Sequence, residues 1–103
     1  IFGDVYVDNV ASDYTGRIMI IRPEYFGSRS FTPDEQLFLA QSGPGCDPKE
    51  YGGAVNGVFL YDREEASITS DCFLGAMREE HIPMWAREAR DDISDEYDEQ
   101  PEM

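Results

Sequence analysis

The run RIMIIR at residues 17–22 restricts the possible folds of this chain more than any other segment. Three of its six residues are isoleucine, whose branched side chain fits a pleated strand better than a helix. Pro23 follows directly and has no N–H for a sheet ladder, so it ends the run. The run therefore predicts a β-strand with one well-buried face.

A second strand pattern precedes this run. In residues 4–10, valines alternate with Tyr6 and Asp8, which gives the period of two expected of a strand. Residues 11–16 are turn formers and join the two patterns. We therefore expect a β-hairpin in which residues 4–10 pair with residues 17–22.

The middle of the chain combines a helical turn with a strand. Thr32, Pro33 and Glu35 stand in the order of an N-cap, a first-turn proline and a capping-box glutamate. A long helix has no room before Gly43. A single helical turn that leads into a strand at residues 37–40 fits this segment better than either element alone.

A second hairpin is predicted farther along the chain. Residues 54–62 read as a strand, with Gly57 at a bulge or a site of close packing. Residues 62–65 form the tip and residues 66–69 return. Residues 70–74 would then make a short turn into the core.

The segment HIPMWAREAR at residues 81–90 predicts the main helix. Pro83 suits a position in the first turn, and Trp85 and Ala89 are spaced to share the face toward the core. Together these patterns predict one α+β domain over residues 1–90. We expect a small, bent antiparallel β-sheet or a partly open barrel, with one C-terminal helix.

Charge separates the end of the chain from the rest. The 103 residues hold 22 acids and 8 bases, for a net charge of −14, and residues 91–103 hold seven of the acids and no base. A block of like charge is typical of a disordered interaction tail, and a frayed, solubilising terminus fits equally well. We expect a disordered acidic tail at residues 91–103.

The loop SGPGCDPKEYGG at residues 42–53 is the first candidate for a catalytic or ligand-binding site, but it does not match the known patterns of such sites. It lacks the spacing of a phosphate-binding loop, and its acids would repel a phosphate. Cys46, Cys72 and His81 are too few and too widely spaced for a typical zinc site. Nothing in the sequence brings His81 to either thiol as a base. We expect a loop with an inward-packed Cys46, no cofactor, no bound metal and no catalytic residue.

The acidic balance disfavours direct binding to nucleic acid or to an anionic membrane and favours a basic protein partner. Regularly placed carboxylates can compete for a groove that normally receives DNA phosphates. Tyr51, Tyr61 and Tyr97 could add contacts, although we expect ordinary packing for Tyr51 and Tyr61. The candidate partner-binding residues are Asp62, Glu64, Glu65, Glu79, Glu80, Asp91, Asp92, Asp95, Glu96, Asp98 and Glu99.

An ordered series of short motifs spans residues 31–88. The series resembles a small domain common in phages, plasmids and integrative elements of gut Firmicutes, whose pattern includes a GxGC-x-P loop and a terminal LP-x-WA motif. Asp62-Arg63-Glu64 departs from the usual D-G-E turn, and Cys72 replaces the usual aspartate. The matching positions are Gln36 to Ala40, Gly43, Gly45, Cys46, Pro48, Val55, Gly57, Leu60, Asp62, Glu64, Phe73, Leu74, Gly75, Ile82, Pro83, Trp85 and Ala86.

The resemblance implies an accessory protein of a mobile genetic element and supplies no catalytic motif. In size, acidity and implied origin, the chain is similar to anti-CRISPR proteins that block a Cas9-type nuclease, some of them by DNA mimicry. It therefore predicts a non-enzymatic inhibitor acting in the cytoplasm of a bacterial host. An interaction module of a conjugative element without inhibitory role is the alternative, and a metal-dependent enzyme is the second. No apolar run approaches the roughly 18 residues of a membrane span, and no secretory signal is recognisable.

Overall fold

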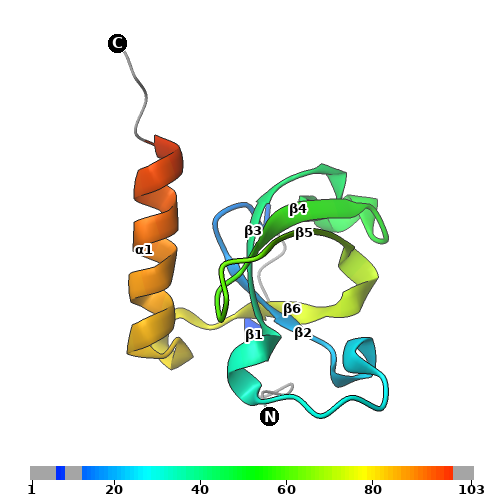
Figure 1. Cartoon of the computed structure of the whole chain (residues 1–103). Helices are drawn as coiled ribbons and strands as arrows, with labels where there is room; N and C mark the ends of the chain where they lie inside the picture. The colour runs from blue at the N-terminus through cyan, green and yellow to red at the C-terminus, as the bar shows by residue number, and fades with distance from the viewer. Residues whose placement is uncertain (1–6, 9–12, 99–103) are drawn as a thin grey trace.

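A computed structural model describes residues 7–8 and 13–98, with residues 8 and 95–98 as backbone alone. Within these residues the chain forms a six-stranded antiparallel sheet and one α-helix (Figure 1). The predicted α+β class is therefore confirmed. The strands are β1 (Val7–Asp8), β2 (Ile18–Ile21), β3 (Leu37–Ser42), β4 (Ala54–Phe59), β5 (Glu65–Thr69) and β6 (Phe73–Met77), and the helix is α1 (Met84–Asp98). Short 3₁₀ turns are η2 (Pro23–Phe26), η3 (Pro33–Gln36), η4 (Pro44–Cys46), η5 (Pro48–Glu50), η6 (Ser70–Cys72) and η7 (Glu79–His81).

The strand order β1-β6-β2-β3-β4-β5 describes a strongly bent sheet that stays open. β5 continues through η6 into β6, but these two strands are not paired with each other. Figure 1 shows the resulting barrel-like curve, with α1 standing beside it rather than inside it. The bend gives the sheet a concave interior and a convex face that the helix covers.

The expected first hairpin is wrong. β1 pairs with β6, where Val7 lies opposite Met77, and β2 has β6 and β3 as its two neighbours. Both edges of β2 are therefore already hydrogen-bonded, so β1 can add only to the outer edge of β6. The other residues of the predicted first strand lie outside the described part of the chain.

β2 is buried on both faces, whereas the sequence pattern suggested one. All four residues from Ile18 to Ile21 are fully buried. Ile18 and Ile20 pack toward α1, while Met19 and Ile21 point into the concave interior. A strand that is covered on both faces has a continuous apolar sequence. Such a sequence lacks the alternation of apolar and polar residues that marks a strand with one buried face.

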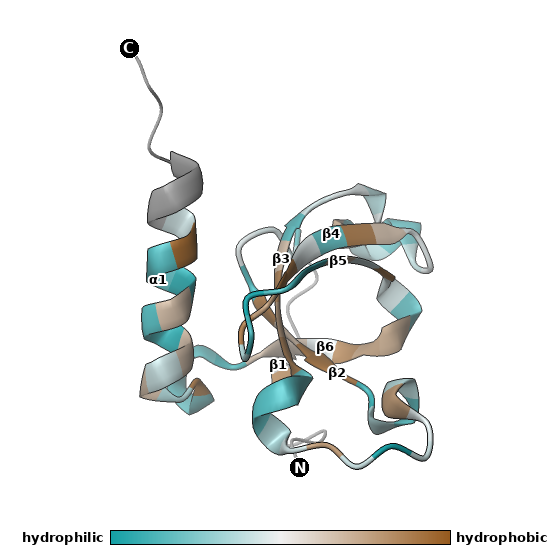
Figure 2. Cartoon of the chain, viewed as in Figure 1, coloured by the Kyte–Doolittle hydropathy of each residue, from teal (hydrophilic) through white to brown (hydrophobic). Residues whose placement is uncertain are grey.

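Two hydrophobic clusters correspond to the two faces of the sheet. Figure 2 shows that the strands carry most of the strongly apolar residues, whereas α1 is largely polar. Consecutive residues of β3 alternate between them, so that Leu37 faces the helix and Phe38 faces the interior. The helix-side cluster contains Ile18, Ile20, Leu37, Leu39, Val58, Leu60, Met77, Ile82, Ala86, Ala89 and Ile93. The interior cluster contains Met19, Ile21, Phe26, Phe38, Ala40, Cys46, Val55, Ile68, Phe73 and Ala76.

Helix α1 begins at Met84, directly after Pro83, slightly later than the predicted residues 81–90, and it also ends later than predicted. The Pro83 carbonyl accepts hydrogen bonds from two backbone N–H groups of the first turn. Trp85 and Ala89 contact the helix-side cluster, and so does Ile93, which is only 3% exposed. Burial of Ile93 stabilises a further helical turn. The helix therefore continues to residue 98, and the predicted tail does not begin at residue 91. Residues 99–103 of the predicted tail lie outside the described residues.

The turn expected at residues 70–74 is only partly right, because η6 ends at Cys72 and Phe73 already begins β6, a strand that the sequence pattern did not predict. Three other local predictions are confirmed. η3 leads into β3, and the Glu35 carboxylate accepts the Thr32 backbone N–H at 3.1 Å, as a capping box requires. β4 and β5 form the second hairpin. Gly57 is a site of close packing, because a Cβ there would lie 2.0 Å from the Leu39 carbonyl oxygen.

The loop at residues 42–53 closes around the interior cluster. Gly43 has φ +109°, which ordinary side chains rarely adopt. A Cβ on Gly45 would lie 2.2 Å from the Gly53 carbonyl oxygen, so two stretches of backbone meet here. Cys46 packs inward at 2% exposure, as predicted.

Candidate functional site

Glu79 belongs to the fold rather than to a free binding surface. Its carboxylate accepts two hydrogen bonds from the Arg90 guanidinium, at 3.1 and 3.3 Å, and lies 3.7 Å from the Arg17 Nε atom. The Arg87 guanidinium donates to the Glu79 backbone carbonyl. These contacts tie η7 to α1 and to the start of β2, so Glu79 has a structural partner for its charge.

Most of the cations of the chain are used in the same way. Six of the eight basic residues hydrogen-bond to a carbonyl or carboxylate of the chain itself: Arg17, Arg22, Arg29, Arg63, Arg87 and Arg90. Several of these bonds go to backbone carbonyls and leave carboxylates elsewhere without a counter-charge. With 22 acids against 8 bases, most carboxylates of the chain therefore have no basic side chain to pair with.

The β4–β5 turn carries the acidic residues Asp62 and Glu64, and an ion pair links this turn to α1. Arg63 sits at the tip with φ +61°, and its guanidinium meets the Asp92 carboxylate at 3.3 Å. The Asp62 carboxylate accepts the Glu64 backbone N–H at 3.1 Å, which shapes the turn. Asp62 and Glu64 are exposed, and neither forms an ion pair with any residue that the structure describes.

The remaining candidate carboxylates are more dispersed. Glu65 is exposed on β5, Glu80 on η7 and Asp91 on α1. Asp95, Glu96 and Asp98 lie on the last turns of α1, where only the backbone is described, and Glu99 lies outside the described residues. The structure thus places Asp62 and Glu64 on one turn, whereas Asp92 is paired with Arg63 and Glu79 with Arg90.

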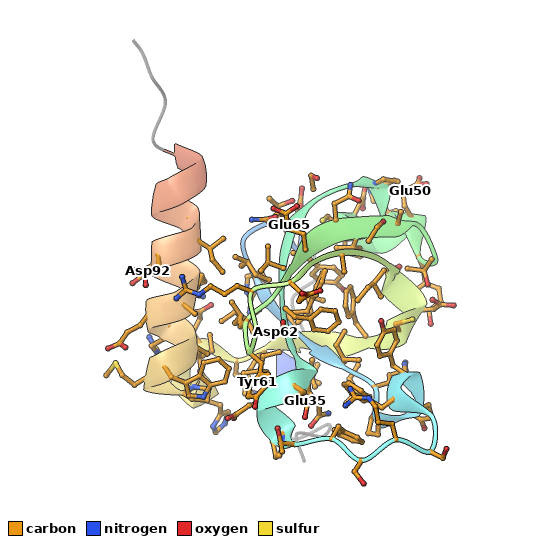
Figure 3. The ribbon with its side chains drawn as sticks, in the orientation of Figure 1. Glu35, Glu50, Tyr61, Asp62, Glu65 and Asp92 are labelled. Carbon is orange, nitrogen blue, oxygen red and sulfur yellow. The ribbon has the colours of Figure 1, made fainter. Side chains whose placement is uncertain are left out.

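A cleft of about 220 Å³ opens beside this turn. Tyr25 and Tyr61 are exposed at 47% and 57% along it, which corrects the expectation that Tyr61 is packed. Figure 3 shows Glu35, Tyr61 and Asp62 gathered on one side of the molecule, with Glu50 at the far end. The complete lining is Tyr25, Phe26, Arg29, Glu35, Phe59, Tyr61, Asp62 and Glu64.

Arg29 and Glu35 form the polar side of this cleft. The Arg29 guanidinium lies 5.1 Å from the centre of the Phe26 ring and donates to the Glu35 carboxylate at 3.0 Å. The pKa of Glu35 lies below its ordinary value, because its carboxylate accepts the Thr32 backbone N–H and then the Arg29 guanidinium. Glu35 therefore stays ionised at neutral pH, and the cleft keeps a fixed pair of opposite charges.

Sequence patterns did not identify Tyr25, Arg29 or Glu35 as site residues. Each belongs to η2, to the following loop or to η3, far in sequence from the β4–β5 turn that completes the cleft. Tyr61, Asp62 and Glu64, which are close together in the sequence, were the local signal for this cleft. Tyr51 is also exposed, at 70%, and lies away from this cleft in the loop after η5.

The cysteines are not arranged for chemistry. Both are free, Cys46 is buried and Cys72 is half-buried. Burial raises the pKa of the Cys46 thiol and so disfavours the reactive thiolate. Within residues 7–8 and 13–98, no group of three or more His, Cys, Asp or Glu side chains is placed to hold a metal ion.

None of the described helices has the length and apolar character needed to cross a membrane. Comparisons of the chain with protein-family models, with curated proteins and with solved structures found no match. The functional argument therefore rests on the surface of this molecule.

Proposed function

We propose that the chain is a non-enzymatic inhibitor encoded by a mobile genetic element, and that it binds a basic DNA-binding surface of a protein in place of DNA. A Cas9-type nuclease is the partner that the family resemblance favours. The observation that carries the proposal is the distribution of charge: six of the eight cations serve internal contacts, while Asp62, Glu64 and Asp91 face solvent.

Such a surface resembles the chemistry of a nucleic-acid backbone. DNA presents one negative charge per roughly 1.7 Å of duplex axis, and its binding releases counterions and depends steeply on salt. A compact protein with fixed carboxylates can gain the same electrostatic attraction for a basic groove. Tyrosines beside the carboxylates add contacts that a simple polyanion lacks.

The test is competition for the nuclease between the full chain and target DNA over a salt series. We expect the chain to displace target DNA and its affinity to fall steeply as salt rises. Binding that is indifferent to salt, or fully compatible with bound target DNA, would contradict the mimicry.

A pair of charge-matched variants sharpens this test. Asp62→Asn with Glu64→Gln removes two charges beside the cleft, whereas Asp47→Asn with Glu50→Gln removes two exposed charges at η5, outside the cleft. Asparagine caps a helical turn as well as aspartate does, so the control should fold normally. We expect the first variant to lose more inhibition than the second. Equal losses would mean that only total charge matters.

An interaction module of a conjugative element would use the same surface on another basic partner. The distinguishing result is a stable complex that leaves DNA binding and cleavage by the nuclease unchanged.

A further inference from the structure

The cleft between η2, η3 and the β4–β5 turn has the shape and charge of a receptor for one cationic side chain. We propose that it binds an arginine side chain from a basic segment of the partner. This inference rests on the proposed function, since it names what the partner offers to the acidic surface. It adds the aromatic residues Tyr25 and Tyr61 to a site that charge alone had defined.

The cleft already binds one guanidinium, that of Arg29, through an aromatic ring and a carboxylate. A second guanidinium, from the partner, would use the same two kinds of contact. Arg29 places its guanidinium 5.1 Å from the centre of the Phe26 ring and 3.0 Å from the Glu35 carboxylate. Stacking on an aromatic face together with a carboxylate hydrogen bond is the preferred arrangement for arginine. One wall of the cleft thus shows that this chemistry fits here.

The rest of the lining offers the same two kinds of group without an occupant. Tyr61 is 57% exposed and Tyr25 is 47% exposed, and both line the cleft. Asp62 and Glu64 border it, and within the described part of the chain neither carboxylate has an ion-pair partner. Large apolar side chains left in solvent beside polar groups are typical of interaction sites.

Charge and size define the occupant further. Glu35, Asp62 and Glu64 contribute three negative charges to the lining and Arg29 contributes one positive charge, which leaves two negative charges to balance. A volume of about 220 Å³ is below the roughly 300 Å³ at which small-molecule sites begin, so one side chain fits better than a cofactor. Arginine is favoured over lysine because its planar group stacks on rings and donates to two carboxylate oxygens at once.

The experiment titrates the full ¹⁵N-labelled chain at low salt with three short peptides that differ only at the central residue. The central residues are arginine, lysine and citrulline, which keeps the shape of arginine without its charge. We expect amide shifts at Tyr25, Tyr61, Asp62 and Glu64, with the arginine peptide about fivefold tighter than the lysine peptide and no binding of the citrulline peptide. Equal binding of all three peptides, or shifts elsewhere on the chain, would overturn the proposal.

Variants at Tyr61 separate the aromatic face from simple apolar contact. Tyr61→Phe keeps the ring and should retain arginine binding, whereas Tyr61→Leu removes the π face and should weaken it about fivefold. Tyr51→Leu, at an exposed tyrosine outside the cleft, is the matched control and should bind as the unmodified chain does. Retained affinity in Tyr61→Leu would refute the stacking arrangement.

The peptide titration needs no nuclease, so its outcome is separable from that of the proposed function. If arginine peptides bind the cleft but the nuclease does not bind the chain, the cleft inference stands and the inhibitor proposal fails. If the nuclease is inhibited equally by the unmodified chain and by Tyr61→Leu with Glu64→Gln, the inhibitor proposal stands and the cleft inference fails.

Discussion

Glu79 and Glu80 are adjacent acids with different roles, and replacing each by glutamine tests the assignment of Glu79 to the fold. Glu79 accepts two hydrogen bonds from Arg90 at 3.1 and 3.3 Å and lies 3.7 Å from Arg17 Nε. Glu80 is exposed and forms no ion pair with a described residue. The two variants remove the same charge from the same 3₁₀ turn.

The expected change in the free energy of unfolding follows from the solvent exposure of the Glu79–Arg90 pair. A hydrogen bond to a charged group is worth about 1.5–3 kcal/mol, while a fully exposed ion pair is worth about 0.2–1 kcal/mol. The Glu79 side chain is 49% exposed and that of Arg90 is 19% exposed, which places this pair between the two cases. We expect Glu79→Gln to lower the free energy of unfolding by about 1–2 kcal/mol. Glu80→Gln should change it by less than about 0.5 kcal/mol.

Urea unfolding followed by the fluorescence of Trp85, the single tryptophan, measures both variants. Trp85 lies on α1 against the sheet, so its emission reports docking of the helix. The Glu79→Gln effect should shrink in high salt because the pair is partly screened. Equal stability of the two variants would refute the structural role and return Glu79 to the candidate partner-binding residues.

Three further outcomes are expected. Gly57→Ala should destabilise the domain by about 3 kcal/mol in the same urea assay, because the new methyl group meets a backbone carbonyl oxygen 2.0 Å away; a neutral effect would contradict the close packing. Ile93→Ala should lower stability by about 2–4 kcal/mol, whereas an unstructured segment after residue 90 would leave it unchanged. Iodoacetamide at neutral pH should alkylate Cys72 faster than Cys46, whose thiol is buried and has a raised pKa, and mass spectrometry of the digested protein can measure the two rates.

Elements set by neighbouring residues could be predicted from the sequence. The strand after Arg17, the capped turn from Thr32 and the helix after Pro83 depend on side-chain branching, on a capping residue and on a missing N–H. These causes act within a few residues of chain. The β4–β5 hairpin belongs to the same group, since its acidic tip separates two strand patterns.

Errors appeared where distant segments compete for the same edge or face. The sequence pattern predicts that the first strand pairs with β2, but both edges of β2 are hydrogen-bonded to β3 and β6. The acids after residue 90 predict that the helix ends there, but α1 continues to Asp98, because Ile93 is buried against the sheet. In both cases contacts across the core outweigh a local preference.

The candidate site shows the same division. The acidity of the chain and the exposed position of Asp62 and Glu64 followed from composition and from the turn pattern. The loss of Glu79 to an ion network could not be predicted, because Arg17 and Arg90 approach it only once the sheet and helix are docked.

The sequence by itself determined an acidic α+β domain, its turns and most of its strands, since these follow from composition and short-range patterns. Only the tertiary structure decided which carboxylates keep a free charge and which aromatic rings stay in solvent. The cleft beside Tyr61 is the clearest case, because its other wall comes from Tyr25 and Glu35. Side chains so far apart in sequence meet only when the sheet bends, and no local pattern encodes that distance.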